Sequence, residues 1–162
     1  MTCECARYPD LPLLRDAIKR RIRETKRLLA RLSLLETNAQ LQLRLYICAV
    51  CGQYWQTGHE WNFGDREYIF RVPAIESSEW LREPYCQPAA MLIYSAAMEN
   101  FFARNSFEDG DAPCREEACA NRSMKQGFFC LDHHLEQLRA VRILPPTPPG
   151  RIFAPYSYSP GA

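Results

Sequence analysis

The spacing of cysteine and histidine residues constrains this chain more than any other feature of its sequence. Cys119 follows Cys114 after four intervening residues, and His133 follows Cys130 after two. A tetrahedral zinc site is often built from two such short pairs separated by a loop, because each pair supplies neighbouring ligands at little entropic cost. The second pair opens a predicted helix, in which residues three apart share one face. The spacing therefore predicts a structural zinc site formed by Cys114, Cys119, Cys130 and His133.

The fourth ligand of this site has two candidates. His134 also follows Cys130 closely, but it shares an apolar stripe with Leu131 and Leu138, so His133 is preferred and His134 is expected in the core. A loop pair followed by a pair in the first turn of a helix is similar to zinc-finger and treble-clef modules in general. The similarity covers residues 114–133.

A further pair, Cys48 and Cys51, is followed by Gly52 and has the form of one half of a zinc knuckle. Half a site needs a second half to bind metal. The candidates for it are Cys3 with Cys5, or His59 with Cys86. A complete second zinc site is one expectation, and the alternative is a lone redox-accessible pair or simple buried thiols. If Cys86 is not a ligand, it is expected to be a buried structural thiol.

Residues 11–43 are predicted to form a long amphipathic helix, because apolar residues recur there mostly at steps of three and four. Unbroken, this helix would be about 50 Å long. It would hold Cys5 and Cys48 far apart, although the second site needs them together. The chain must then fold back near Thr37–Asn38, or two chains must pair through this helix as an antiparallel homodimer.

The remainder of the sequence predicts an α+β fold with a small sheet or hairpin and two further helices. A strand is expected at 68–72, and helices are expected at 88–104 and 128–144. We therefore divide the chain into a basic helix (1–45), a zinc-stabilised α+β domain (46–144) and a proline-rich extended tail (145–162).

The motifs of common enzyme classes are missing from the sequence. It contains no His-Glu-x-x-His, no Gly-x-x-x-x-Gly-Lys and no Gly-x-Ser-x-Gly pattern, and only three histidines in all. We therefore expect a protein without catalytic activity that binds another protein. The expected anchors are aromatic residues of a glycine-containing loop, since exposed aromatics are frequent interface anchors. They are Tyr54, Trp55, Trp61 and Phe63.

Charge is distributed unevenly and suggests a second class of partner. Residues 1–45 carry ten Lys or Arg against five Asp or Glu, whereas residues 46–162 carry ten against fourteen. Clustered basic residues suit phosphate contacts, so nucleic acid is the alternative partner. The residues that would make these contacts are Arg20, Arg23, Arg27 and Arg31. The net charge of only +1 for the whole chain argues against binding to nucleic acid.

The sequence also indicates where the protein works. Its first residues lack the apolar run of a signal peptide, and the longest apolar run, residues 89–98, is too short to cross a bilayer. We therefore expect a cytoplasmic protein that does not associate with membranes. Cysteines stay reduced in that compartment, so Zn²⁺ is a better explanation of their pairing than disulfides.

Overall fold

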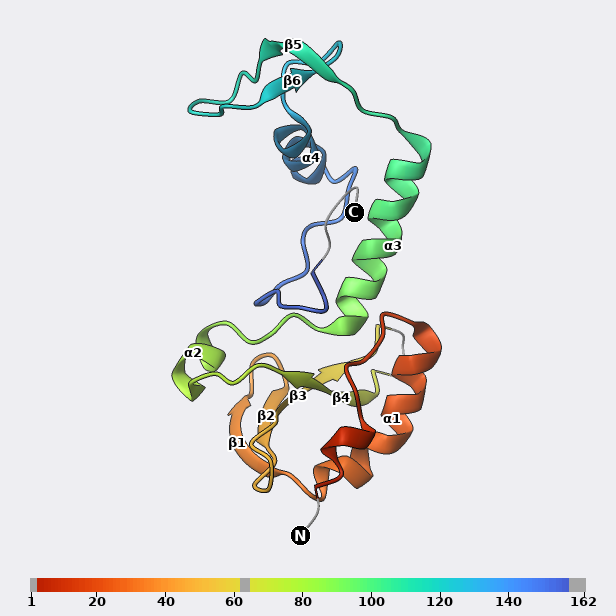
Figure 1. Ribbon diagram of the computed structural model, residues 1–162, viewed down its shortest axis with the longest axis vertical. Helices are drawn as coiled ribbons and strands as arrows, with labels where there is room; N and C mark the ends of the chain where they lie inside the picture. Colours follow the sequence, from red (N-terminus) through yellow and green to blue (C-terminus); the bar gives the residue numbers. More distant parts are fainter. Residues whose placement is uncertain (1–2, 62–64, 158–162) are drawn as a thin grey trace. The chain divides into compact units, whose positions relative to one another are not determined.

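The computed structural model describes residues 3–61 and 65–157, and it divides the chain into two compact units (Figure 1). The first unit runs as far as Ile93 and includes the chain again from Pro148, and the second comprises Tyr94–Thr147. Helices and antiparallel sheets are mixed along the chain. The prediction of an α+β fold is therefore confirmed.

The first unit is built on a four-stranded antiparallel sheet in the order β1-β2-β3-β4. Its strands are β1 (Ser33–Asn38), β2 (Leu43–Ile47), β3 (Tyr54–His59) and β4 (Glu67–Val72). Tyr46 pairs with Trp55, and Trp55 pairs with Arg71, so one line of neighbours crosses the three strands β2 to β4. β4 is rich in aromatic and β-branched residues, which fit a pleated and buried surface. The strand predicted at 68–72 is confirmed.

Helix α1 (Arg15–Leu29) packs against β4 of this sheet. Leu28 is buried on its inner face, as is the side chain of Arg21. The Arg21 guanidinium donates hydrogen bonds to the carbonyl oxygens of Ile69 (3.2 Å) and Pro9 (3.0 Å). A buried cation therefore ties the helix to the sheet and to the segment that precedes the helix.

The predicted helix over residues 11–43 is correct for α1 but wrong beyond it. After Leu29 the chain enters β1, which pairs antiparallel with β2 through a bulge between Leu34 and Glu36. Leucines that suit a helix face also suit a strand, and helix propensity is a weak preference that tertiary pairing overrides. The chain does reverse next to the predicted position, Thr37–Asn38, but it does so in the turn between two strands.

Two further helices follow the sheet, α2 (Ser77–Arg82) and α3 (Pro88–Arg104), the latter with the bounds predicted for it. The start of α3 is attached to the sheet, because the hydroxyl of Tyr68 accepts a hydrogen bond from the Ala89 N–H (2.9 Å). A Cβ on Gly58 of β3 would lie 2.9 Å from the Gln87 side-chain oxygen. A larger residue at position 58 would therefore displace the Gln87 side chain from β3.

The proline-rich segment from Pro148 to Ser157 packs within the first unit. Arg151 exchanges backbone hydrogen bonds with Pro84 and Cys86. Tyr156 is buried, its ring meets Phe70 edge to face, and its hydroxyl accepts a hydrogen bond from a backbone N–H of the N-terminal segment. The aromatic rings of this C-terminal segment therefore form part of the core of the first unit.

The second unit contains the C-terminal part of α3, a two-stranded hairpin and a last helix. These elements are β5 (Asp109–Pro113), β6 (Arg122–Met124) and α4 (Leu131–Ala140). The rings of Phe101, Phe102 and Phe107 lie within 5.8 Å of one another, centroid to centroid. The helix expected at 128–144 is present as the shorter helix α4. Among the described residues, none of the helices is both long and apolar enough to cross a membrane.

Candidate metal centres

The structure brings together all eight residues that the spacing of the sequence singles out as ligands. They form two groups: Cys3, Cys5, Cys48 and Cys51, and Cys114, Cys119, Cys130 and His133. Within each group the donor atoms all lie within 4.8 Å of one another. Each group can therefore hold one metal ion.

The first centre combines a turn between two strands with the N-terminal segment. Cys48 follows β2 directly, and its backbone oxygen accepts a hydrogen bond from the N–H of Gly52 (2.8 Å). Gly52 has φ of +72°, a left-handed conformation that glycine adopts without strain. The turn carries Cys48 and Cys51 side by side on one loop. The predicted knuckle is therefore a β2–β3 connection.

The other two ligands of the first centre come from the segment around the 3-10 turn η1 (Cys5–Arg7). The Cys3 sulfur lies 3.5 Å from that of Cys48 and 3.3 Å from that of Cys51. Between the two ligands, Glu4 forms ion pairs with Arg27 in the last turn of α1 and with Arg31, which follows the helix. The hydrogen bond from Arg31 is the main reason that the pKa of Glu4 is lowered. These ion pairs fix the loop next to the helix.

One chain supplies all four ligands of the first centre. The chain reversal after α1 brings β2 back to the N-terminal segment, so no second copy is needed to join the pairs. The alternative half-site is separate: the His59 ring nitrogens face the backbone oxygens of Gln42 and Asp65, and Cys86 is buried elsewhere. Burial raises the pKa of Cys86 to about 11, as befits a structural thiol.

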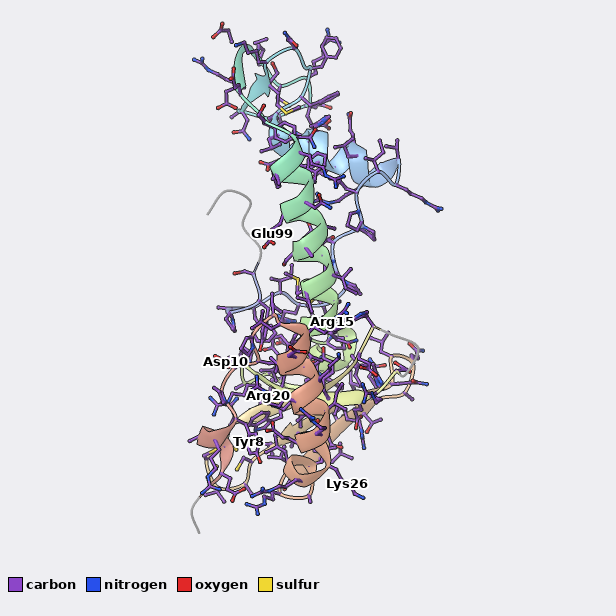
Figure 2. The ribbon with its side chains drawn as sticks, turned by 90° about the vertical axis from the view of Figure 1, so that its right-hand side faces the viewer. Tyr8, Asp10, Arg15, Arg20, Lys26 and Glu99 are labelled. Carbon is purple, nitrogen blue, oxygen red and sulfur yellow. The ribbon has the colours of Figure 1, made fainter. Side chains whose placement is uncertain are left out.

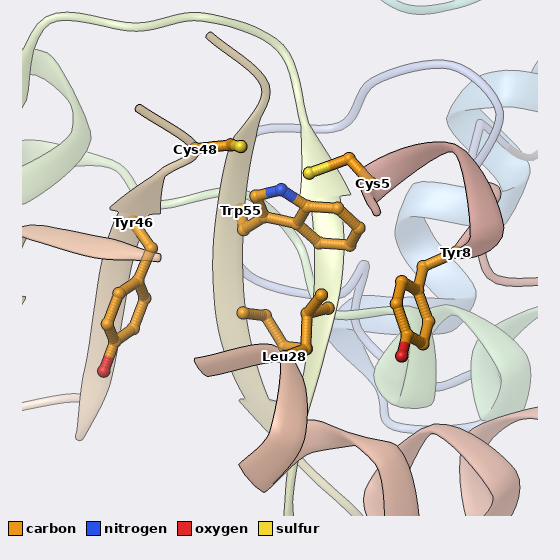
Figure 3. Close-up of a cluster of buried hydrophobic side chains, with 7 residues drawn as sticks. Cys5, Tyr8, Leu28, Tyr46, Cys48 and Trp55 are labelled. Carbon is orange, nitrogen blue, oxygen red and sulfur yellow. The ribbon is translucent and has the colours of Figure 1, made fainter. Parts of the chain in front are cut away.

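The first centre rests on the hydrophobic core of its unit. Cys5 and Cys48 belong to a buried cluster that also contains Trp55, Leu28 and Tyr46 (Figure 3). Burial alone disfavours a thiolate. The backbone N–H groups of Cys51 and Val50 nevertheless lower the pKa of Cys48 to about 6, because they donate hydrogen bonds to its sulfur. Burial and contacts with the other thiols raise the pKa of Cys5.

The second centre is formed by the hairpin loop and the start of α4. The His133 Nδ1 lies 3.4 Å from the Cys114 sulfur and 3.3 Å from the Cys130 sulfur. Cys119 lies between β5 and β6, 3.9 Å from Cys130. Burial would raise the pKa of Cys114, but hydrogen bonds from the N–H groups of Cys130 and Glu116 lower it overall. The loop backbone thus stabilises a thiolate.

Helix α4 explains why His133 belongs to this group and His134 does not. Cys130 is the N-cap residue of α4, so His133 lies in the first turn, on the side of the cysteine. His134 is directed elsewhere, and its ring centroid lies 6.1 Å from that of Phe107. The preference for His133 is consistent with this placement, and His134 is only partly buried, although it was expected in the core.

The residues predicted to bind a partner are scattered over the first unit. Trp55 is fully buried, so its prediction as an exposed interface anchor is wrong: β3 directs it into the core. Tyr54 and Trp61 are partly exposed, and Phe63 lies outside the described residues. The basic residues are all exposed, but two of them pair with Glu4. They are Arg20, Arg23, Arg27 and Arg31.

The sequence did not predict that Arg71 and Trp55 lie beside the first centre. Arg71 of β4 donates a hydrogen bond from Nη2 to the Cys5 backbone oxygen (2.6 Å), and its guanidinium carbon lies 5.6 Å from the Trp55 ring centroid. A cation beside a thiolate cluster offsets negative charge. No short motif marks either residue, because their proximity to the cysteines arises only when the sheet forms.

Each centre offers four protein donors, three or four of them sulfur. Sets that supply every ligand of a tetrahedral ion leave no position for water or substrate and serve to hold a fold together. The arrangement can therefore bind metal in both units and connect segments that are distant in the sequence. No protein-family model, no curated protein and no solved structure matches this chain.

Proposed function

We propose that this chain is a non-enzymatic protein-interaction module in which each unit is stabilised by one structural zinc ion. The observation that carries this proposal is the closed set of four protein ligands in each group. A catalytic zinc site keeps an open position beside a general base, and neither group provides one. We place the protein in the cytosol, where thiol ligands stay reduced.

Zinc is the metal that suits these donors best. Thiolate and imidazole ligands in sets of four select zinc among the abundant divalent ions, because Mg²⁺ and Ca²⁺ prefer oxygen ligands. The X-ray absorption spectrum of the zinc-loaded protein tests both the metal and the closed shell. The two sites together offer seven sulfurs and one nitrogen. The spectrum averages over both zinc ions, so it should fit 3.5 sulfurs and 0.5 nitrogen per zinc, with Zn–S distances of about 2.3 Å. A water oxygen in the shell would contradict the structural role.

A protein partner is favoured by leucines exposed around the edge strand β1. Leu34 lies on β1, whose outer edge has no strand partner among the described residues. Asn38 connects Leu41 and Leu81, because it accepts a hydrogen bond from the N–H of Leu41 (3.0 Å) and donates one to the Leu81 oxygen (3.2 Å). Leu34, Leu41 and Leu81 are each at least 40% exposed. Exposed apolar residues beside an open strand edge are typical of protein-docking surfaces.

The double variant Leu34→Asp/Leu41→Asp tests this surface. We expect it to lose binding to a cellular protein that wild type retains at high salt, and to keep its zinc. Leu14→Asp changes an equally exposed leucine elsewhere in the first unit, and this variant should bind as wild type does. Equal binding by all three proteins would rule out the β1 edge as the docking surface. Sedimentation velocity would show whether the partner is a second copy of the chain.

Nucleic acid is the second candidate, because the outer face of α1 is strongly basic. Arg15, Arg20 and Lys26 line the exposed side of the helix (Figure 2). Lys19, Arg20, Arg23 and Lys26 form no ion pair with any described carboxylate. A stripe of free cations on one helix face can contact several phosphates.

Salt dependence separates the two candidates. If α1 binds nucleic acid, affinity for a DNA or RNA duplex falls steeply with salt, with a logarithmic slope of about −0.9 per phosphate contacted. Replacing Arg23 and Lys26 by Gln should then make this slope shallower by about two. Absence of duplex binding at low salt would eliminate this candidate and leave the protein partner.

A further inference from the structure

Trp55 carries a buried hydrogen-bond donor without a partner. Its side chain is fully buried, and its indole Nε1 has no acceptor among the described residues. The other fully buried tryptophan, Trp80, donates from its Nε1 to the side-chain oxygen of Gln56 at 2.7 Å. Leaving a buried N–H unpaired costs about 1–3 kcal/mol. The two fully buried tryptophans therefore differ in that only the Trp80 indole N–H is paired.

The nitrogen edge of Trp55 faces the first metal centre. Trp55 shares its buried cluster with Cys5 and Cys48, and Figure 3 shows the indole nitrogen on the side of the ring nearest the two sulfur atoms. Both cysteines are about as buried as the tryptophan, at 5% exposure each. The indole nitrogen therefore lies on the side of the ring next to the two least exposed ligands of the group.

Once a metal is bound, the negative charge of the thiolate group favours hydrogen-bond donors around it. Four thiolates around one divalent cation leave a net charge of −2 in a largely buried place, and hydrogen bonds to charged groups are stronger than those between neutral groups. The neighbouring donors are already arranged to offset it: the Cys5 N–H donates to Cys3 Sγ (3.1 Å), and the Arg71 guanidinium lies over the Trp55 ring. The indole N–H would be a further donor.

We propose that Trp55 is a positioning residue of the first metal centre, donating an N–H···S hydrogen bond to the thiolate pair of Cys5 and Cys48. The indole orients the two buried ligands and lowers the electron density on their sulfurs. It thereby disfavours protonation of the thiolates and loss of the metal. This inference rests on the proposed metal binding, and it adds a role that ligand spacing does not reveal.

The direct test is nuclear magnetic resonance of the full chain loaded with ¹¹³Cd and labelled with ¹⁵N. A hydrogen bond to a metal-bound sulfur gives a scalar coupling between the indole proton and cadmium, which a structural role in packing would not produce. We expect one of the three tryptophan indole protons to show this coupling, and its assignment to Trp55 is made by loss of the signal in Trp55→Phe. If that variant does not fold, Trp80→Phe and Trp61→Phe assign the signal by elimination.

Metal release provides an independent readout. Zinc transfer to a chelator should show one of its two phases accelerated about tenfold in Trp55→Phe, the lower end of the usual effect of outer-shell partners. Trp80→Phe removes an indole of equal burial away from the cysteines and should leave both phases within about twofold of wild type.

The outcomes distinguish this inference from the metal proposal itself. Cadmium bound at the first centre without coupling to any indole proton would overturn the role of Trp55 and leave the metal centre in place. Failure of the chain to bind cadmium at Cys3, Cys5, Cys48 and Cys51 would overturn both.

Discussion

The side chain of Gln56 is a buried polar group that connects β3 to the segment following the sheet. It is fully buried on β3, and its oxygen accepts hydrogen bonds from the Trp80 indole N–H (2.7 Å) and the Tyr85 N–H (2.9 Å). Its amide nitrogen donates to the Tyr85 oxygen at 2.8 Å. One side chain thus satisfies three buried groups from the segment that follows the sheet.

Replacing Gln56 by Leu should destabilise the protein by about 2–4 kcal/mol, because the buried partners lose their hydrogen bonds while little volume is lost. Gln40→Leu is the matched control, since Gln40 is exposed in the β1–β2 turn, and its effect should stay within about 0.5 kcal/mol. Urea denaturation followed by tryptophan fluorescence measures both. Equal stability of the two variants would show that the Gln56 hydrogen bonds contribute nothing net.

At the level of single residues, the membership of the two candidate ligand groups could be predicted from the sequence, whereas the surroundings of these groups could not. Short spacings such as Cys48 to Cys51 indicate a chelating pair by themselves, because ligand geometry is local. The burial of Trp55 is not local, since it depends on the pairing of β3 with β2 and β4. The segment around Trp55 lacks clear alternation of polar and apolar residues, so it resembled a loop.

At the scale of elements, the start of α4 selects one histidine of two. The helix begins after Cys130, and the first turn directs His133 towards the cysteines. His134 follows in the chain but packs near Phe107. A change of one residue along a helix turns the side chain by about 100°, so the two neighbours cannot exchange roles without moving the helix.

We therefore expect His133→Ala and His134→Ala to differ in metal content. His133→Ala removes a ligand and should lose the metal of the second centre, whereas His134→Ala should retain it and lose only packing, about 1 kcal/mol. Elemental analysis of the two purified variants decides the question. Metal loss in His134→Ala with retention in His133→Ala would reverse the assignment.

The helix predicted over residues 11–43 was wrong where the chain forms β1. Leu35 continues the steps of four and three residues from Leu28 and Leu32 that fit a helix, yet residues 33–38 form β1. Their register with β2, such as Leu34 opposite Tyr46, is set by a partner strand that a local pattern cannot include. α3, in contrast, has its predicted bounds, because Pro88 at its first position fixes the start locally.

At the scale of the whole molecule, each compact unit contains one of the two metal centres. All three tryptophans belong to the first unit, as do Cys3, Cys5, Cys48 and Cys51. The second centre joins only residues of the second unit. Tryptophan fluorescence therefore reports on the first unit alone, whereas circular dichroism reports on both.

Cys119→Ser should consequently lose one metal and part of its helical circular dichroism, while the position and intensity of its tryptophan emission stay as in wild type. Cys51→Ser is the reciprocal variant, and it should shift the emission, because Trp55 lies against the first centre. A changed emission spectrum in Cys119→Ser would show that the first unit does not keep its fold when the second centre is lost.

If the chain holds two zinc ions, one in each unit, the zinc content of protein purified without a metal-binding tag will show it. Elemental analysis should give two zinc ions per chain for wild type, and one each for Cys48→Ser and Cys114→Ser. Folded wild-type protein without zinc would contradict the account, and the cysteines would then be core thiols.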